Sequence, residues 1–566
     1  MEYEILLINI SRDCSGYSSS FRDSIGQYLL AGYIRKHNFK GFVFSGNIRE
    51  CKEKIEEAIC DKKVPVIGFY AAADNIRIVA HTITWIKKEY PFVKTLIGGP
   101  QAIALDNTFF NVTKNDFAII GEGEIPLLFL LEAVVDETRS LDSVPSLIWK
   151  DSDTDQLIIN HCDNAVIQDL DSIPYPSMDD SLIGNLRQGP IVGIITGRGC
   201  PYQCTFCYEG ANAKNVRFRS IDNVMEEIDY ITSLNPRMEY ISIYDDTFTL
   251  KDERILEFCD NMRKRKLMWF CEGHITFVLN HEETLKTMIE SGLSCIQFGI
   301  ESGNNDVLSL YNKHTNYEMI NKGITICKKQ GISGITGNFI IGGANESDES
   351  IEDSKRLAKD LINNAKGIIE LYVVYFAPYP NTKIVNMPEL FSMKLHPELE
   401  QYNLNTMRSP VIETKGLSTK EIYEKKHEFD DFIQAQYKEA AKNPNKSDVL
   451  QGLFHDGVRI HLNPTWEKYY LEQPHVVTFL EHLTIEEQNF FQDRYIIRTF
   501  EDVLIDDDKL VTEIGTFVDI EKEILLNATG ILSAREMAES FNISISEIEK
   551  IFYKLNDKCL VYMSEF

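Results

Sequence analysis

Two series of alternating strands and helices predict an α/β fold with two parallel sheets, followed by a mostly helical C-terminal region. Such alternation is typical of parallel sheets that are covered by helices. The 566 residues are enough for about three domains. We predict an N-terminal unit at 1–140, a connector at 141–190, a barrel at 191–385 and a C-terminal region at 386–566.

The composition, with 43% hydrophobic and 25% charged residues, is that of a soluble globular protein. No apolar run approaches the roughly 18 residues of a membrane helix, and the N-terminus begins a strand rather than a secretory leader. Twelve cysteines without a paired pattern favour a reducing compartment. A net charge of −28 would repel a polyphosphate backbone. We therefore expect a cytoplasmic protein with no membrane and no nucleic-acid partner.

Apolar runs and amphipathic segments alternate in the N-terminal unit. The predicted strands are 4–10, 40–45, 65–70, 94–98 and 117–120, and the predicted helices are 24–36, 48–60, 75–90 and 125–135. This order predicts a doubly wound, Rossmann-like sheet, whose ligands bind where loops leave the carboxyl ends of strands. Two glycine-rich loops lie at such ends, where glycine lets a flat ligand approach the backbone, although tight turns alone would also explain them. Their candidate binding residues are Gly98, Gly99, Pro100 and Gln101 in the first loop, and Gly121, Glu122 and Gly123 in the second.

The connector contains a predicted small hairpin, formed by residues 146–150 and 156–160. It ends in Ile173-Pro-Tyr-Pro-Ser177, where two prolines enforce an extended path. We expect this strap to carry the chain from the first sheet to the second.

The second series predicts a partial (β/α)6 barrel. The predicted strands are 191–196, 240–244, 268–271, 295–299, 334–341 and 371–376, and the predicted helices are 221–233, 251–264, 281–291, 317–329 and 347–363. Chemistry in such barrels takes place at the carboxyl ends of the strands.

Three cysteines follow the first barrel strand at C-x3-C-x2-C spacing: Cys200, Cys204 and Cys207. Three thiolates on one short loop can bind three irons of a 4Fe–4S cluster and leave the fourth iron open to a small molecule. Zinc usually takes four ligands in two pairs, and no second C-x-x-C occurs in the chain. The spacing therefore predicts an iron–sulfur cluster whose metal ligands, and catalytic centre, are these three cysteines.

The cysteine spacing, with Phe206 before the last cysteine, resembles the signature of radical S-adenosylmethionine enzymes. Further motifs at 244–249, 298–303, 338–343 and 375–380 follow in the order found in the subgroup with an N-terminal cobalamin-binding domain. The resemblance covers about the first 385 residues and not the remainder.

This resemblance implies three cofactors, namely a 4Fe–4S cluster, S-adenosylmethionine and cobalamin, and an external electron donor such as flavodoxin or ferredoxin. The two glycine-rich loops would face the corrin ring and nucleotide tail of cobalamin. Many cobalamin domains carry a histidine in the loop after the first strand, but here that loop, residues 11–17, has none. We therefore expect base-off cobalamin without a histidine ligand.

The resemblance also places adenosylmethionine among residues at the strand ends. The candidate contacts are Phe206 and Tyr208 beside the cluster, Glu301 and Ser302 near the amino group or ribose, and Gly342 beside the adenine. Asp245 and Asp246 could bind hydroxyl groups or cap the next helix. Arg217 and Arg219 could contact a carboxylate or phosphate, but we expect them to be solvated charges.

The C-terminal region contains predicted helices at 419–441 and 447–458. Only Cys559 follows Cys327, too few ligands for an auxiliary cluster. Helices at 517–526, 533–541 and 546–555 and a strand at 560–563 then resemble a winged-helix unit (about 515–566). That order also resembles the domains that bind leader peptides in ribosomal peptide maturation, while a packing or dimerisation element remains an alternative.

We therefore predict a cobalamin-dependent radical enzyme, with C-methylation of an unactivated carbon as the favoured reaction. The resemblance implies a 5′-deoxyadenosyl radical and methylcobalamin, and the substrate would be a peptide or a natural-product intermediate. The alternatives are a radical cyclase, oxidase or epimerase without methyl transfer, or a catalytically silent binding protein of the same fold.

Overall fold

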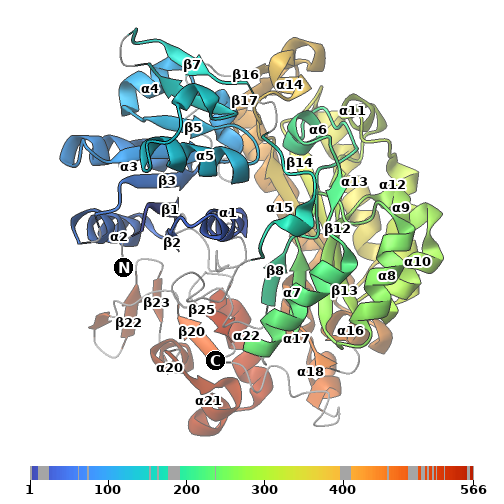
Figure 1. Ribbon diagram of the computed structural model, residues 1–566. Helices are drawn as coiled ribbons and strands as arrows, with labels where there is room; N and C mark the ends of the chain where they lie inside the picture. The colour runs from blue at the N-terminus through green and yellow to red at the C-terminus, as the bar shows by residue number, and fades with distance from the viewer. Residues whose placement is uncertain are drawn as a thin grey trace.

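The structure is a computed structural model of the whole chain. It describes all residues except 1–2, 11–24, 62, 73–74, 152–153, 162–164, 176–190, 236–237, 396–409, 456–457, 482–494, 499–503, 507–508, 513–514, 518, 528, 557–560 and 565–566. In Figure 1 the blue N-terminal sheet lies beside the green-to-yellow barrel, and the red C-terminal elements lie below both.

The N-terminal unit is built on a seven-stranded sheet of order β2-β1-β3-β4-β5-β6-β7. Its strands are β1 Ile5–Ile10, β2 Gly41–Gly46, β3 Val66–Tyr70, β4 Lys94–Gly98, β5 Phe117–Ile119, β6 Leu147–Lys150 and β7 Leu157–Ile159. The first five strands pair in parallel, which confirms the predicted strands. The predicted connector hairpin forms, but it extends this sheet as antiparallel β6 and β7.

Helices cover both faces of this sheet, as predicted for a doubly wound fold. They are α1 Ile25–Lys36, α2 Ile48–Cys60, α3 Ile76–Glu89, α4 Asn107–Thr113 and α5 Glu124–Val134. α1 and α5 share one apolar core with the sheet, and α2, α3 and α4 share the other. The order of the parallel strands reverses between β1 and β3, and ligands of such sheets bind outside the carboxyl ends at this point.

The barrel is a six-stranded parallel sheet of order β15-β14-β13-β12-β11-β8. Its strands are β8 Ile191–Ile194, β11 Tyr240–Ile243, β12 Met268–Gly273, β13 Leu293–Glu301, β14 Gly334–Ile341 and β15 Ile369–Tyr375. The predicted helices are confirmed as α7 Ile221–Leu234, α8 Asp252–Met262, α10 Glu282–Glu290, α12 Tyr317–Gln330 and α13 Asp348–Asn364. β8 and β15 are the edge strands of this sheet, so the barrel is partial, as predicted.

Short helices that the sequence analysis did not predict lie in the barrel loops. They are α6 Tyr208–Asn212, α9 Ile275–Asn280, α11 Asn305–Leu310 and α14 Lys383–Asn386. α6 begins directly after the third cysteine of the motif, since Cys207 is its N-terminal flanking residue.

The connector packs between the two sheets. Ile167, Leu170 and Ile173 form a buried apolar cluster with Leu29 of α1. Lys36 Nζ donates a hydrogen bond of 2.9 Å to the carbonyl of Ser172. Residues 176–177 of the predicted extended strap lie outside the described residues.

The C-terminal region begins on the β15 side of the barrel. Its helices are α15 Thr419–Ala440, α16 Lys446–Leu453, α17 Pro464–Leu471 and α18 Pro474–Glu481. Tyr437 of α15 and Trp466 of α17 both donate hydrogen bonds to the carbonyl of Ile369, at 3.0 and 2.7 Å. The predicted extension of α16 to residue 458 is wrong, because Phe454–His455 and Val458–Arg459 pair as the antiparallel strands β18 and β19.

The last part of the chain combines helices with two small sheets. The predicted helices are α20 Asp519–Asn527, α21 Ala534–Phe541 and α22 Ile545–Asn556, and the predicted final strand is β25 Val561–Ser564. The strands that the sequence analysis missed are β20 Tyr495–Arg498, β21 Leu504–Asp506, β22 Lys509–Thr512, β23 Gly515–Phe517 and β24 Thr529–Ser533. α22 is joined to α17 by Tyr553, whose hydroxyl donates to buried Glu467.

None of the helices in the described part of the chain is both long enough and apolar enough to span a bilayer.

Candidate functional site

The cysteine loop (residues 195–207) begins where β8 ends, at the carboxyl edge of the barrel. Gly199 has φ +88°, and a Cβ there would come within 2.5 Å of the carbonyl of Asn215, so the turn requires glycine. The amide of Cys200 donates to the carbonyl of Ala213 at 2.9 Å. The loop is thus folded back on residues 213–215.

All three predicted cysteine ligands are free thiols in this loop. Cys200 is buried, and Cys204 and Cys207 are half-buried. Burial is the main cause that raises the pKa of each thiol, and the positive charge of Lys313 partly offsets it at Cys204. Because a thiol that coordinates a metal is deprotonated, metal binding would reverse this preference for the neutral form.

Asp245 and Asp246, which follow β11, bind the backbone of the cysteine loop. Asp245 accepts hydrogen bonds from the amide and hydroxyl of Thr196, at 2.6 and 2.5 Å, and from the amide of Gly197 at 2.9 Å. Asp246 accepts from the amide of Gly199 at 2.7 Å. Of the two alternatives for these aspartates, capping of the next helix is wrong, since Lys251 precedes α8, and binding of hydroxyl groups stays a prediction. Burial, followed by the charge of Glu209, raises the pKa of Asp246 to about 7.

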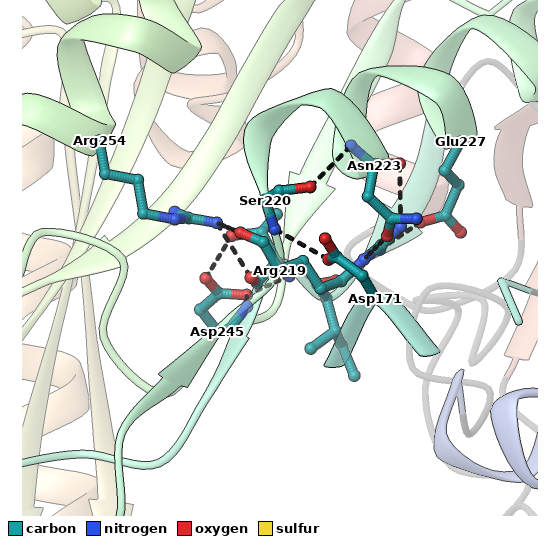
Figure 2. A network of polar contacts seen from close by, with 10 residues as sticks. Asp171, Arg219, Ser220, Asn223, Glu227, Asp245 and Arg254 are labelled. Carbon is teal, nitrogen blue, oxygen red and sulfur yellow. Dashed lines mark hydrogen bonds and ion pairs between the residues drawn. The ribbon is translucent and has the colours of Figure 1, made fainter. Parts of the chain in front are cut away.

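Two arginines donate hydrogen bonds to backbone carbonyl groups of the same loop (Figure 2). Arg254 donates to the carbonyl of Thr196 at 2.9 Å, and Arg219 donates to the carbonyl of Ile195 at 2.9 Å. Arg219 also pairs with Glu227 at 2.5 Å and is buried, so the expectation of a solvated charge at this position is wrong.

Arg217 is not a solvated charge either. It lies on β10 (Arg217–Phe218), which pairs with β9 (Gly197–Arg198) of the cysteine loop. Its guanidinium binds Glu122, a candidate binding residue of the N-terminal sheet. Arg198 binds Glu122 as well, at 2.8 Å, so the two sheets meet at this carboxylate.

Glu301 ends β13 in a left-handed conformation, with φ +63°. Its Oε1 lies 2.9 Å from Nζ of Lys313 in a pair whose side chains are only 8% and 12% exposed. Burial lowers the pKa of Lys313, but Glu301 and then Cys204 outweigh it, so the pKa rises to about 12. A Cβ on Gly299 would come within 2.0 Å of the Glu301 carboxylate, which explains the glycine of this motif.

The segment that carries Lys313 also holds the cysteine loop. The amide of Thr205 donates to the carbonyl of Tyr311 at 3.0 Å, and Asn312 Nδ2 donates to the carbonyl of Gln203 at 2.9 Å. These bonds fix the lysine beside the middle of the cysteine motif.

His274 is a further site residue that the sequence analysis missed. Its ring stacks on Tyr202 of the cysteine loop, with centroids 4.2 Å apart and planes inclined by 15°. Its Nε2 lies 3.0 Å from the carbonyl of Lys313. Burial, and then the charge of Lys313, lowers its pKa to about 4, so the imidazole is neutral near pH 7.

The other candidate contacts of adenosylmethionine pack against the protein itself. Ser302 Oγ accepts a hydrogen bond of 3.1 Å from the amide of Asn304 and so closes a loop. Gly342 has φ +80°, and a Cβ there would meet Ile422 at 3.0 Å and Ile412 at 3.2 Å. Gly342 therefore makes room for these side chains, and its contact with adenine stays a prediction.

The two aromatic candidates pack on tyrosines. The ring of Phe206 packs edge-on against Tyr311, with centroids 4.8 Å apart, and that of Tyr208 packs against Tyr379 at 6.3 Å. Burial raises the pKa of Tyr208 to about 12.

The glycine-rich loops of the N-terminal sheet lie at its carboxyl edge. Among the described residues other than each glycine's chain neighbours, none has a heavy atom within 4 Å of a Cβ built on Gly98 or Gly121. Gly99 has φ +97°, where a Cβ would come within 2.7 Å of the Ala71 carbonyl, and Pro100 and buried Gln101 begin a short 3-10 helix. Gly123 precedes α5. The expected absence of a histidine ligand concerns residues 11–17, which lie outside the described residues.

Residues 194–358 match the family model of the radical SAM superfamily. An uncharacterized methyltransferase of Pyrococcus horikoshii is 27% identical over 410 residues, which are 70% of this chain and 84% of that protein. The anaerobic magnesium-protoporphyrin IX monomethyl ester cyclase of Rubrivivax gelatinosus is 25% identical over 58% of this chain and 61% of its own length. The structure of the cobalamin-dependent S-adenosylmethionine radical enzyme OxsB, with aqua-cobalamin and S-adenosylmethionine bound, aligns with a TM-score of 0.63 at 16% identity, over 87% of this chain and 75% of that one.

Proposed function

We propose that this chain, which carries a radical S-adenosylmethionine domain and has the fold of a cobalamin-dependent radical enzyme, is a cobalamin-dependent methyltransferase that acts on carbon. One observation carries the proposal. Three thiols lie on a single loop at the carboxyl edge of a parallel partial barrel, and Arg198 of that loop binds the strand-end loop of a second α/β sheet. This contact would bring the two proposed cofactor sites next to each other.

The residues at both sites fit the groups that the proposal requires. Cys200, Cys204 and Cys207 offer three sulfur ligands for a 4Fe–4S cluster. Gly98 and Gly121 have no side chain that would block a flat corrin ring at this strand-end edge, and the described residues leave space around both. When bound, the cluster supplies the electron that cleaves S-adenosylmethionine reductively, and cobalamin carries the methyl group.

The protein's own contribution is positioning and electrostatics. Asp245 and Asp246 hold the backbone of the cysteine loop in one conformation. Lys313 places a positive charge beside Cys204 and Cys207, which stabilises the thiolate form that binds iron. Neutral His274 packs on the loop without adding charge.

We further propose a peptide or a small natural-product intermediate as substrate. The peptide alternative rests on the C-terminal helices α20, α21 and α22 and the strand β25, whose order resembles that of a winged-helix unit. The reaction also needs an external reductant such as flavodoxin or ferredoxin, which fits a reducing, cytoplasmic location.

A second candidate function is radical cyclisation without methyl transfer, which the similarity to the magnesium-protoporphyrin cyclase favours. Both candidates require the same cysteine loop. They differ in whether S-adenosylhomocysteine, the product of methyl transfer, is formed.

Anaerobic reconstitution with iron, sulfide and cobalamin tests the proposal. We expect about four irons per chain, a retained base-off corrin spectrum, and formation of both 5′-deoxyadenosine and S-adenosylhomocysteine. Four irons without corrin would favour cyclisation over methyl transfer. Failure to incorporate iron would contradict the radical mechanism altogether.

Deletion of residues 517–566 tests the peptide alternative. We expect the truncated protein to lose turnover of a peptide substrate while it still cleaves adenosylmethionine. The retained cleavage is the control for folding, and unchanged peptide turnover would contradict a role in substrate binding.

A further inference from the structure

Four charged residues join the N-terminal sheet to the cysteine loop. Arg198 and Arg217 lie directly opposite each other on the two-stranded ribbon of β9 and β10. Glu122 and Glu124 lie at the carboxyl end of β5, where the glycine-rich loop meets α5. We call these four residues the charged joint.

The contacts within the charged joint cross from one sheet to the other. Arg198 Nη1 lies 2.8 Å from Glu122 Oε2, and its Nη2 lies 2.6 Å from Glu124 Oε1. Arg217 binds both carboxylate oxygens of Glu122. Arg217 also donates to the carbonyl of Ile167, so the connector is bound at the same point.

The charges of the joint balance, and its members are largely buried. The side chains of Glu124, Arg217 and Arg198 are 4%, 9% and 16% exposed, and that of Glu122 is 24% exposed. Two arginines side by side on a ribbon repel each other unless an anion lies between them, and Glu122 occupies that position. Loss of one carboxylate would leave a guanidinium charge largely buried and uncompensated.

The backbone on both sides of the joint leads directly to the proposed cofactor sites. Arg198 stands between Gly197, which Asp245 binds, and Gly199, which Asp246 binds, two residues before Cys200. On the other side, Glu122 follows Gly121, where a Cβ would meet none of the described residues within 4 Å apart from its chain neighbours. A change in the conformation of either loop must therefore move an arginine–carboxylate pair.

We propose that the charged joint is a positioning device that couples the two loops, so that a ligand bound at the Gly121 loop orders the cysteine loop. Glu122 then acts through Arg198 and Arg217 rather than as a direct ligand of a cofactor. The identity of the ligand, cobalamin, rests on the proposed function, but the coupling itself does not.

Hydrogen–deuterium exchange of the cofactor-free protein tests the coupling first. We expect Glu122→Gln to raise amide exchange in residues 195–207 by about tenfold, as loss of a charged hydrogen bond would do. The matched control is Glu132→Gln, which removes a pair of similar geometry, Arg139 Nε to Glu132 Oε2 at 2.7 Å, within the N-terminal unit. Equal exchange of the cysteine loop in wild type and Glu122→Gln would overturn the proposal.

A second measurement separates positioning from general loss of stability. Hydroxocobalamin should lower exchange of residues 195–207 in wild type and Glu132→Gln, and leave it unchanged in Glu122→Gln, with all three proteins compared at a temperature at which each is folded. If Glu122→Gln transmits the protection as wild type does, the joint does not couple the loops. If wild type shows no corrin spectrum at all, the proposed function fails, and the cofactor-free comparison still decides the coupling.

A double-mutant cycle provides the third test. Glu122→Gln and Arg217→Gln should each raise exchange of the cysteine loop, and the double variant should raise it by less than the product of the two factors, because both variants remove the Arg217–Glu122 pair. Independent, multiplicative effects would contradict a joint that acts as one unit.

Discussion

Lys313 Nζ lies 2.9 Å from Glu301 Oε1, in a buried ion pair next to Cys204. Glu301 ends β13, and Lys313 lies in the loop between α11 and α12, so the pair forms only when both elements have folded onto the barrel mouth. One lysine thereby balances a carboxylate and favours ionised thiols. The pair links the stability of the barrel to the chemistry of the cysteine loop.

Replacement of this lysine should destabilise the fold. Lys313→Met leaves the Glu301 carboxylate buried without its cation, so we expect the free energy of unfolding to fall by about 3–5 kcal/mol. Urea denaturation measures the change. The double variant Lys313→Met/Glu301→Gln should recover part of the loss, and equal stability of the single and double variants would contradict the argument.

Each cysteine of the motif should be needed for iron binding. We expect Cys200→Ala, Cys204→Ala and Cys207→Ala to lower iron from about four atoms per chain to less than one after reconstitution, and to abolish adenosylmethionine cleavage. Iron analysis and chromatographic detection of 5′-deoxyadenosine check this. Cys60→Ala is the matched control, since Cys60 is exposed on α2. Full iron content in any of the three variants would show that this cysteine is not a ligand.

Asp245 should stabilise the cysteine loop more than an exposed acid of the same barrel. Asp245→Asn removes the charge of a buried carboxylate that binds two backbone amides and lies near Arg254. We therefore expect the free energy of unfolding to fall by about 1.5–3 kcal/mol. Asp229→Asn, which breaks a pair between an exposed aspartate and Arg265, should cost less than about 1 kcal/mol. Thermal unfolding compares them, and equal effects would show that the buried acid has no special role.

Glu370 should make the protein less stable as the pH rises from 4.5 to about 7. Burial raises the pKa of Glu370 from 4.5 to about 7, although backbone amides at Thr465 and Trp466 oppose this. In that window the folded state keeps a proton that the unfolded state has released, so each pH unit lowers stability. Glu370 alone would contribute about 3 kcal/mol, at 1.36 kcal/mol per unit.

Glu370→Gln tests this sign, because the amide oxygen can still accept the hydrogen bond from Thr465. Urea denaturation at pH 5 and pH 8 should show a smaller loss of stability in the variant than in wild type. Glu346, whose pKa burial also raises to about 7, should leave some pH dependence in both proteins. An equal loss in both would contradict the assignment to Glu370.

Apolar periodicity and the alternation of strands and helices predicted most elements of the two large sheets. The long helices of both large sheets were found because their apolar pattern repeats over several turns, and short strands such as β5 and β8 were found because they alternate with these helices. α4 and α6, with seven and five residues, are too short to show a period. The strands β20 to β24 were missed because three to five residues carry little pattern.

The cysteine motif could be predicted because its three ligands are close together in the sequence. The residues that bind the cysteine loop are far from it in the sequence. Asp245 lies 49 residues from Thr196, and Arg217 lies 95 residues from Glu122. Lys313 and His274 likewise reach the site only through folding. A single sequence shows which charges exist, but not which of them meet.

Other parts of the chain pack against both end strands of the barrel sheet. At β8, a Cβ on Gly193 would collide with Ile25 of α1, so the N-terminal unit lies directly against this strand. At β15, Tyr437 and Trp466 bind the carbonyl of Ile369. Exposed strand edges recruit other strands, so residues 191–385 expressed alone would present two surfaces prone to aggregation. We therefore expect the barrel to depend on both flanking segments for its stability.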